Sequence, residues 1–150
     1  MKRIGILTSG GDCGGLNAAV RSIFYRAKEK YNLDVYGILE GTVGLMERPP
    51  RYIKLDYGTF SGNLIRQGGT FLGTTNKGNP FKYPMPDGTF KDRTTEIVGG
   101  YHELGLDGLI VIGGDGSMKI IKEIADKGNL NIVAIPKTID LSLIHISEPT

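Results

Sequence analysis

The residues best suited to chemistry lie in two glycine-rich turns, each of which separates an apolar run from a helical pattern. Residues 8–17 read TSGGDCGGLN, and residues 112–117 read IGGDGS. Glycines let backbone N–H groups approach a phosphate closely, and the positive end of the following helix favours a bound anion. Asp115 adds a hard oxygen suited to Mg²⁺, and Ser117 can cap the helix or bind a phosphate. Both turns therefore predict a phosphate site, with a tight turn that holds no ligand as the alternative.

Neither turn matches the two common phosphate-binding signatures. No G-x-G-x-x-G spacing occurs in either turn, which argues against a dinucleotide fingerprint. Gly10 and Gly15 have the spacing of a Walker A loop, but Leu16 stands where that loop requires Lys. The predicted phosphate site is therefore of another kind.

A third polar segment, residues 136–140, follows an apolar run and reads PKTID. Asp140 is a candidate base that could take the proton from an attacking hydroxyl. Lys137 is a candidate cation for the charge that develops during phosphoryl transfer. From these five residues alone, an ordinary turn led by Pro136 is the simpler interpretation.

The elements that must position these turns alternate along the chain. Short apolar runs predict buried strands, and apolar residues at helical spacing predict helices between them. The expected strands cover residues 3–7, 34–39, 109–112 and 131–135, and the expected helices cover residues 16–30, 94–104 and 118–127. This order predicts an α/β fold, a parallel sheet with helices on both faces in a Rossmann-like three-layer arrangement. Ligands of such folds bind at the carboxyl ends of the strands, where all three polar segments lie.

Two further expectations concern the rest of the chain. The polar segment 80–93 is expected to be a surface excursion. In the expected helix at 94–104, Gly99-Gly100 weakens the helical pattern. The 150 residues include 18 Lys and Arg against 16 Asp and Glu, which argues against nucleic acid or membrane surfaces as partners. Because the chain has one cysteine, no secretory leader and no apolar span, we expect a soluble cytoplasmic protein.

Five motifs together resemble the 6-phosphofructokinase family. They read LTSGGD at 7–12, GLNAAVR at 15–21, GGTFLGT at 68–74, GGDGS at 113–117 and PKTID at 136–140. They occur in the order and at the spacing of that family, over residues 2–140. The resemblance implies a glycolytic kinase that transfers phosphate from Mg-ATP, or from pyrophosphate in one branch, to the 1-hydroxyl of fructose 6-phosphate. It also implies that the full-length enzyme is a homo-oligomer.

The resemblance assigns roles to individual residues. It implies that ATP is bound by Gly11, Lys77, Gly78, Gly114, Asp115, Gly116 and Ser117. Asp115 would also hold Mg²⁺, which is the expected cofactor. Thr138, Ile139 and Asp140 would face the sugar phosphate, with Asp140 as the base for its 1-hydroxyl. These roles agree with phosphoryl transfer, which depends mainly on positioning and charge neutralisation.

Two residues bear on the phosphoryl donor. Gly116 is typical of the ATP-using branch, since the pyrophosphate branch usually has Asp there and so fills the room that a nucleotide needs. Lys137 is typical of the pyrophosphate branch. A blocking side chain excludes ATP more firmly than a nearby Lys demands pyrophosphate, so the prediction is ATP, with pyrophosphate as the alternative.

The carboxyl end departs from the family. After Asp140 the family continues with Asn and Asp and then runs on for more than a hundred residues, whereas residues 141–150 read LSLIHISEPT. These ten residues resemble a translated sequencing adapter, so we expect an incomplete nucleotide-binding domain at 1–140 and an artefactual tail at 141–150. Such a fragment is expected to be inactive alone. Two competing interpretations stay open: a related kinase for a nicotinamide dinucleotide or a lipid, and a non-catalytic nucleotide-binding module.

Overall fold

A mostly parallel five-stranded sheet forms the centre of the molecule, in the order β3-β2-β1-β6-β7. The computed structural model describes residues 2–9, 16–60, 71–73 and 79–136. The strands are β1 (Arg3–Thr8), β2 (Asp34–Ile38), β3 (Tyr52–Lys54), β6 (Gly108–Gly113) and β7 (Ile132–Pro136). Strands β1, β2, β6 and β7 run parallel, and β3 pairs antiparallel with β2 at one edge.

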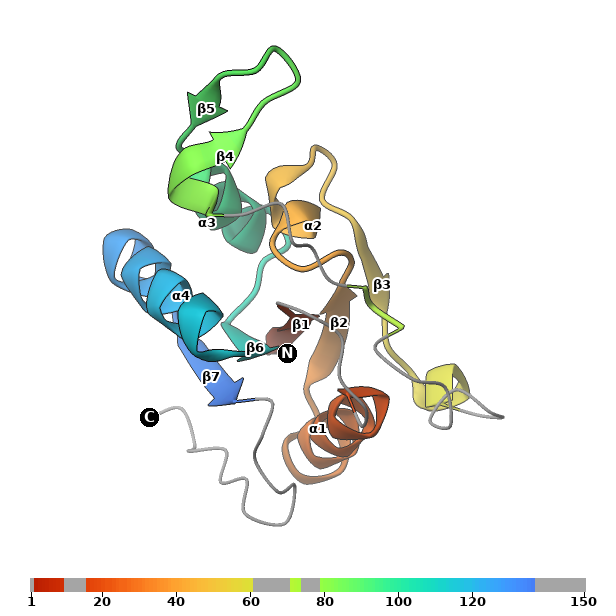
Figure 1. Ribbon diagram of the computed structural model, residues 1–150. Coiled ribbons are helices and arrows are strands. Elements are labelled where there is room, and N and C mark those ends of the chain that lie inside the picture. Colours follow the sequence, from red (N-terminus) through yellow and green to blue (C-terminus); the bar gives the residue numbers. More distant parts are fainter. Residues whose placement is uncertain (1, 10–15, 61–70, 74–78, 137–150) are drawn as a thin grey trace.

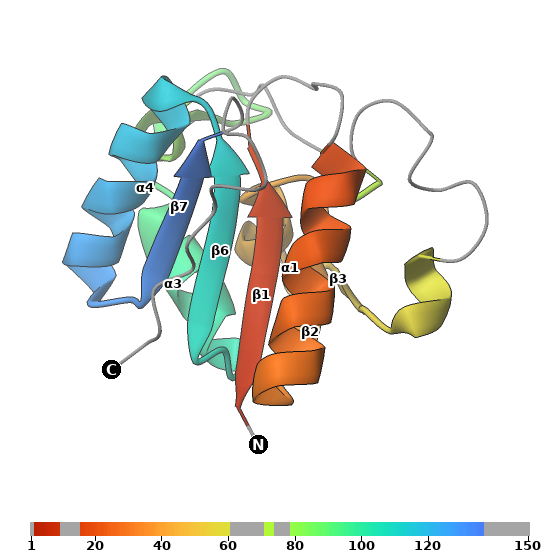
Figure 2. The ribbon, with the colours of Figure 1, turned by 90° about the horizontal axis from the view of Figure 1, so that it is seen from below.

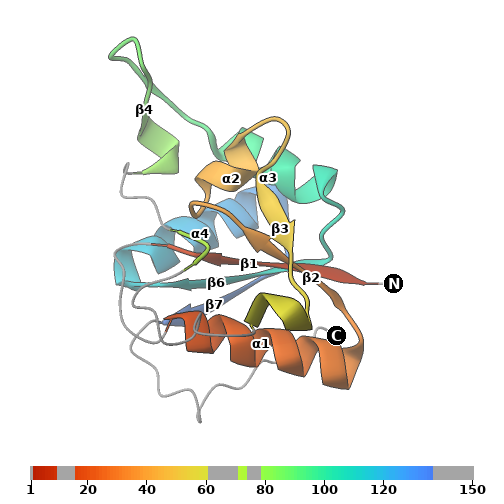
Figure 3. The same cartoon turned by 90° about the vertical axis from the view of Figure 1, so that its right-hand side faces the viewer.

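Helices cover both faces of this sheet (Figure 3). Helix α1 (Leu16–Tyr31) lies on one face, and α2 (Val43–Met46), α3 (Thr94–Glu103) and α4 (Asp115–Gly128) lie on the other. This three-layer α/β arrangement confirms the predicted fold class. In the part of the chain that the structure describes, no helix combines the length and apolar character needed to span a bilayer.

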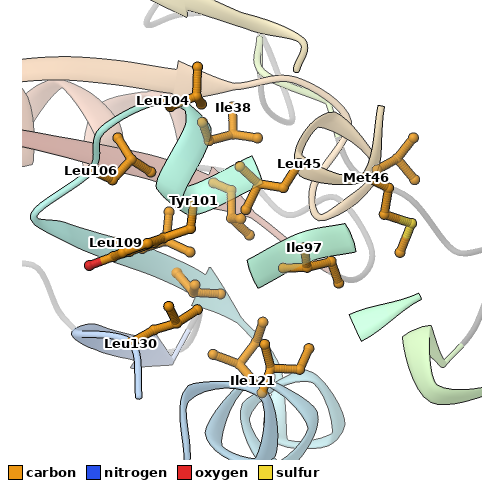
Figure 4. Close-up of a cluster of buried hydrophobic side chains, with 14 of the residues drawn as sticks. Ile38, Leu45, Met46, Ile97, Tyr101, Leu104, Leu106, Leu109, Ile121 and Leu130 are labelled. Carbon is orange, nitrogen blue, oxygen red and sulfur yellow. The ribbon is translucent and has the colours of Figure 1, made fainter. Parts of the chain in front are cut away.

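Strand β6 explains why the central strands are apolar throughout. Leu109 and Val111 pack with α2, α3 and α4 in one cluster, part of which Figure 4 shows. Ile110 and Ile112 point to the other face and pack with α1. Because successive side chains of a strand alternate between faces, a strand covered on both sides must be apolar at every position. All six residues of β6 are buried.

The helix boundaries follow local signals. Helix α1 buries the predicted stripe, and it ends before Asn32, whose left-handed φ of 51° closes the last turn. Helix α4 begins at Asp115, three residues before the predicted start at Met118. The apolar pattern begins only at Met118, whereas Gly114 forms the N-cap and starts the helix earlier.

The two glycines that weaken the pattern of α3 have a packing role. A Cβ added to Gly100 would lie 2.2 Å from the carbonyl oxygen of Leu45 in α2, so this glycine allows the two helices to approach. At Gly99, the added Cβ would instead meet the end of the Arg48 side chain, 2.7 Å away. Tertiary packing therefore overrides the low helix propensity of this pair.

The polar excursion at 80–93 has its own structure. It contains a 3-10 turn, η3 (Pro80–Lys82), and a hairpin of β4 (Tyr83–Pro84) and β5 (Phe90–Lys91) that projects from the body (Figure 1). Pro80 and Tyr83 are buried, whereas the Phe90 side chain is 71% exposed. The residue pattern did not predict this hairpin, nor α2, β3 or a second 3-10 turn, η1 (Tyr57–Phe60).

Candidate functional site

The carboxyl ends of three neighbouring parallel strands meet at one edge of the sheet. The register pairs Thr8 of β1 with Ile112 of β6, and Gly113 of β6 with Pro136 of β7. Figure 2 shows the three arrowheads pointing the same way, with the first turns of α1 and α4 at the same end. Each of the three strands therefore ends at this edge, and each is followed in the sequence by one of the three polar segments.

The turn from β6 into α4 brings backbone amides to the edge. Gly114 has an extended backbone (φ −88°, ψ 178°) and no side-chain cap, and its carbonyl accepts the 3.0 Å hydrogen bond from the Met118 amide. The predicted phosphate contacts Asp115, Gly116 and Ser117 form the first turn of α4. First-turn amides have no partner within a helix, and they carry the positive end of its dipole. This geometry suits an anion.

Gly113 lies in a tight contact, where an added side chain would require its neighbours to shift. A Cβ at this position would lie 3.2 Å from Cβ of Ser117 and 3.2 Å from the carbonyl oxygen of Ser9. The end of β1 and the first turn of α4 thus approach one another directly across Gly113. Glycine at position 113 therefore favours this close approach.

A hydrogen bond between two hydroxyls joins the first polar segment to the second. Ser9 Oγ donates to Ser117 Oγ at 3.2 Å, and both side chains are only partly accessible. The Ser9 amide donates to the Ile112 carbonyl at 2.8 Å, which extends the pairing of β1 with β6 past Thr8. Two motifs that are 108 residues apart are therefore in direct contact.

A third chain segment, residues 71–73, is fixed beside β1. The buried Thr8 hydroxyl donates to the Gly73 carbonyl at 3.0 Å, and the Glu40 amide donates to the Leu72 carbonyl at 2.8 Å. Gly73 adopts a left-handed φ of 77°, which glycine tolerates without strain. The motif at 68–74 therefore ends against the carboxyl end of β1.

Asn17, the second residue of α1, ties this segment to the helix. Its side chain is 2% exposed, and its Oδ1 accepts a 2.7 Å hydrogen bond from the Phe71 amide. A buried amide that satisfies a backbone donor of a distant segment fixes the position of that segment. Asn17 thus joins the start of α1 to the chain that leads toward residues 74–78.

The chain beyond residue 78 is fixed in turn. Asn79 Oδ1 accepts a 2.9 Å hydrogen bond from the Phe81 amide and caps η3. The buried Pro80 carbonyl accepts a 2.8 Å bond from the Arg93 amide, just before α3. The described residues on both sides of 74–78 are therefore held by the body of the protein.

Charged groups with shifted pKa values lie around the hairpin and α3. The hydrogen bond from Arg93 lowers the pKa of the Glu96 carboxylate, and Lys91 adds to this effect. The Thr94 hydroxyl and amide donate to Asp92, just before α3, and lower the pKa of its carboxylate. Burial raises the pKa of Tyr101. These contacts attach the hairpin to α3, and we assign them a structural role.

The predicted site residues fall into two groups. Gly114, Asp115, Gly116 and Ser117 lie together at the carboxyl edge, where the structure describes the backbone of Asp115 and Gly116. Outside the described residues lie Gly11, Lys77, Gly78, Lys137, Thr138, Ile139 and Asp140. Within the described residues, no group of three or more His, Cys, Asp or Glu side chains is placed to hold a metal ion.

Several residues that build the edge have no role predicted from the sequence. They are Thr8, Ser9, Asn17 and Gly73, and all four lie within the quoted motifs. For Ser9, the sequence signal for a functional role is that a polar residue directly follows a buried strand. Its partner could not be identified without the register that pairs β1 with β6.

Comparison with known proteins assigns the family. The family model described as phosphofructokinase matches residues 3–147. The chain is 59% identical over 140 residues to ATP-dependent 6-phosphofructokinase 1 of Synechocystis sp., and 56% identical over 139 residues to the protein of that name from Nostoc sp.. Each alignment covers 93% of this chain, and the chain spans 38% of the length of each relative.

A solved structure agrees with the sequence comparisons. Phosphofructokinase from Saccharomyces cerevisiae superimposes with a TM-score of 0.68 and 29% identity, covering 93% of this chain and 20% of that one. The layered sheet, its carboxyl edge and the sequence matches lead to the same assignment. The chain belongs to the phosphofructokinase family.

Proposed function

We propose that this chain is the nucleotide-binding part of an ATP-dependent 6-phosphofructokinase, which phosphorylates fructose 6-phosphate to fructose 1,6-bisphosphate. The observation that carries the proposal is the turn from β6 into α4, where Gly113 and Gly114 open the first turn of the helix at the carboxyl edge. The names of the cyanobacterial relatives support the choice of activity. The complete protein is proposed to act in the cytoplasm as a homo-oligomer.

The first turn of α4 would bind the phosphates of ATP. Backbone amides of residues 114–117 would donate to phosphate oxygens, and the Ser117 hydroxyl would add a side-chain donor. Mg²⁺ usually binds through one or two carboxylates together with substrate phosphates, and Asp115 supplies one such carboxylate. The bound ion would neutralise phosphate charge. Gly11, Lys77 and Gly78 would complete the contacts to the nucleotide.

The sugar phosphate would bind beside the nucleotide, at the end of β7. Gly113 pairs with Pro136, so residues 137–140 begin one strand away from the phosphate-binding turn. Thr138, Ile139 and Asp140 would contact the sugar. The Asp140 carboxylate would accept the proton of the sugar's 1-hydroxyl as the hydroxyl oxygen bonds to the terminal phosphorus of ATP and the bond from that phosphorus to ADP breaks. Lys137 would stabilise the charge on the transferring group.

We propose ATP rather than pyrophosphate as the donor. Gly116 carries no side chain into the first turn of α4, which leaves room for a nucleotide. Lys137 is the feature that favours pyrophosphate. The choice of donor is tested by measuring kcat/KM with ATP and with pyrophosphate. A higher kcat/KM with pyrophosphate would show that pyrophosphate is the donor.

We also propose that the chain divides at residue 140. The nucleotide-binding domain would cover residues 1–140, and residues 141–150 would be a translated sequencing adapter. The match to the family model runs to residue 147, seven residues beyond this boundary. Whether residues 141–150 are a translated adapter can be tested by resequencing the source DNA across the Asp140 codon, from a library without transposase adapters. Codons for Asn and Asp after Asp140 are expected, and codons for Leu141 to Thr150 would overturn the adapter interpretation.

Activity can be tested in a chimera. Residues 2–140 would replace the matching part of the Synechocystis relative, to which the chain is 59% identical. We expect Mg-ATP-dependent phosphorylation of fructose 6-phosphate, and we expect Asp140→Asn to lower kcat by about two orders of magnitude or more. Mg-ATP binding without any turnover would favour a nucleotide-binding module instead. Phosphorylation of a nicotinamide dinucleotide or a lipid would favour the related kinases.

A further inference from the structure

Ser9 lies where β1 meets the proposed phosphate-binding turn. It is not one of the residues proposed to contact ATP. Its amide is fixed by the 2.8 Å hydrogen bond to the Ile112 carbonyl, and its hydroxyl donates to Ser117 at 3.2 Å. Backbone and side chain of one residue therefore hold both the last part of β6 and the first turn of α4. Ser9 thus couples the strand register to the position of a hydroxyl in the proposed phosphate site.

The direction of this hydrogen bond matters for Ser117. A serine hydroxyl has one proton to donate and two lone pairs to accept. A phosphate oxygen at the first turn of α4 can only accept, so it would take the Ser117 proton, and Ser9 would then be the hydroxyl that donates to Ser117 Oγ. Each hydrogen bond in such a chain polarises the next one.

The surroundings restrict the two hydroxyls to this arrangement. Gly113 lies between the two residues, and an added Cβ there would crowd them, at 3.2 Å from Ser117 Cβ and 3.5 Å from Ser9 Cβ. Ser117 is in the first turn of a 14-residue helix, and Ser9 is held by the strand register. Neither backbone can move independently of the sheet, so the pair is built in advance of any ligand.

We propose that Ser9 is a positioning residue for the nucleotide, whose hydroxyl orients the Ser117 hydroxyl toward a phosphate of ATP. This inference rests on the proposed function, since it requires ATP at the first turn of α4. Ser9 acts through Ser117, without a contact of its own to the ligand. Its effect on ATP binding should therefore vanish when the Ser117 hydroxyl is absent.

A double-mutant cycle on the 150-residue chain tests the proposal. Mg-ATP affinity is measured by calorimetric titration for the wild type, Ser9→Ala, Ser117→Ala and the double variant. Ser9→Ala is expected to weaken binding about two- to tenfold, the effect of losing one hydrogen bond. In the Ser117→Ala background, the same change should have no further effect. Ser22→Ala, at an exposed serine of α1, is the matched control and should bind as the wild type does.

Two results would overturn the proposal. One is an unchanged affinity in folded Ser9→Ala, and the other is an equal loss in both backgrounds, which would indicate a general structural role. If Ser9→Ala does not fold, Ser9→Cys keeps the shape with a much weaker donor, and unchanged affinity in that variant also overturns it. Failure of the folded wild type to bind Mg-ATP would overturn the proposed function itself, and the Ser9 role with it.

Discussion

At the scale of single residues, Gly113 is held closely from two sides at the carboxyl edge. Its neighbours are a backbone carbonyl of Ser9 and the Cβ of Ser117, neither of which can rotate away. A methyl group here would push the end of β1 away from the first turn of α4. The position of the turn from β6 into α4 is therefore sensitive to a side chain at residue 113.

Gly113→Ala is expected to reduce the free energy of unfolding by about 1 kcal/mol, because it overpacks a contact that cannot relax freely. It should also weaken Mg-ATP binding. Gly108→Ala in the same strand is the control, since its Cβ would make only ordinary contacts, the nearest at 3.5 Å to Asn131. Urea unfolding and calorimetric titration measure both effects. Equal affinities in the two variants would show that Gly113 does not position the turn.

The sequence allowed part of the edge to be predicted at this scale. Gly114 and Ser117 could be placed at this edge because a glycine-rich turn between a strand and a helix is recognisable in the sequence. Thr8 and Asn17 could not, since their partners, Gly73 and Phe71, are more than fifty residues away. A side chain that holds a distant backbone group leaves no local pattern.

At the scale of elements, the crossing of α2 and α3 depends on a backbone contact. Gly100→Ala should cost about 2 to 3 kcal/mol of unfolding free energy, because the new Cβ would lie 2.2 Å from the Leu45 carbonyl oxygen. The adjacent Gly99→Ala meets only the flexible end of Arg48, so its change should stay below about 1 kcal/mol. Chemical denaturation of both variants checks this. Similar losses would mean that the helices separate without difficulty.

The first turn of α3 also predicts a dependence of stability on pH. Glu96 is held by Arg93 at 2.5 Å and by Lys91 at 3.2 Å, and its pKa in the folded protein is below the ordinary value of 4.5. The unfolded state therefore takes up the proton first as the pH falls. The contribution of this carboxylate is complete above about pH 4.5 and is lost as the pH falls through the lower, folded pKa.

Glu96→Gln should accordingly reduce the unfolding free energy by about 0.5 kcal/mol at pH 7, since the pair is partly exposed. The difference from the wild type should shrink below pH 4.5. Urea unfolding at stepped pH measures it. Arg93→Gln should remove most of the same pH dependence, and Glu96→Gln should then add little to it. A difference that stays constant down to acid pH would contradict this account.

Long elements were predictable and short ones were not. The buried stripe of α1 carries enough residues to define a helical period, and the four apolar runs are recognisable as continuous buried strands. Helix α2 has four residues and β3 has three, too few for any period to be read. Both are stabilised by contacts with neighbouring elements, such as the hydrogen bond from the Arg51 amide to the Gly44 carbonyl.

At the scale of the whole molecule, β7 is, with β3, one of the two edge strands of the sheet among the described residues. It pairs with β6 on one side, and Ala134 in its middle is exposed. An unprotected edge strand can pair with another chain, and charged side chains reduce that tendency. Self-association of the 150-residue chain would arise here.

Ala134→Lys is therefore expected to reduce self-association of the 150-residue chain and to leave its unfolding free energy within about 0.5 kcal/mol of the wild type. Sedimentation at increasing protein concentration measures the first effect, and urea unfolding measures the second. Ser22→Lys adds the same charge on α1, away from the edge. If both variants associate to the same extent, net charge rather than the edge controls association.

The strand order has a consequence for the growing polypeptide. Strand β1 lies between β2 and β6, and the amide of Arg3 finds its partner in Asp107, 104 residues later. Ribosomes add about 5 to 20 residues each second, so roughly 5 to 20 s pass before the central pairing can form. During that interval β1, α1 and β2 can assemble only half of a hydrophobic layer. The nascent chain would present this half-layer to chaperones until β6 leaves the ribosome.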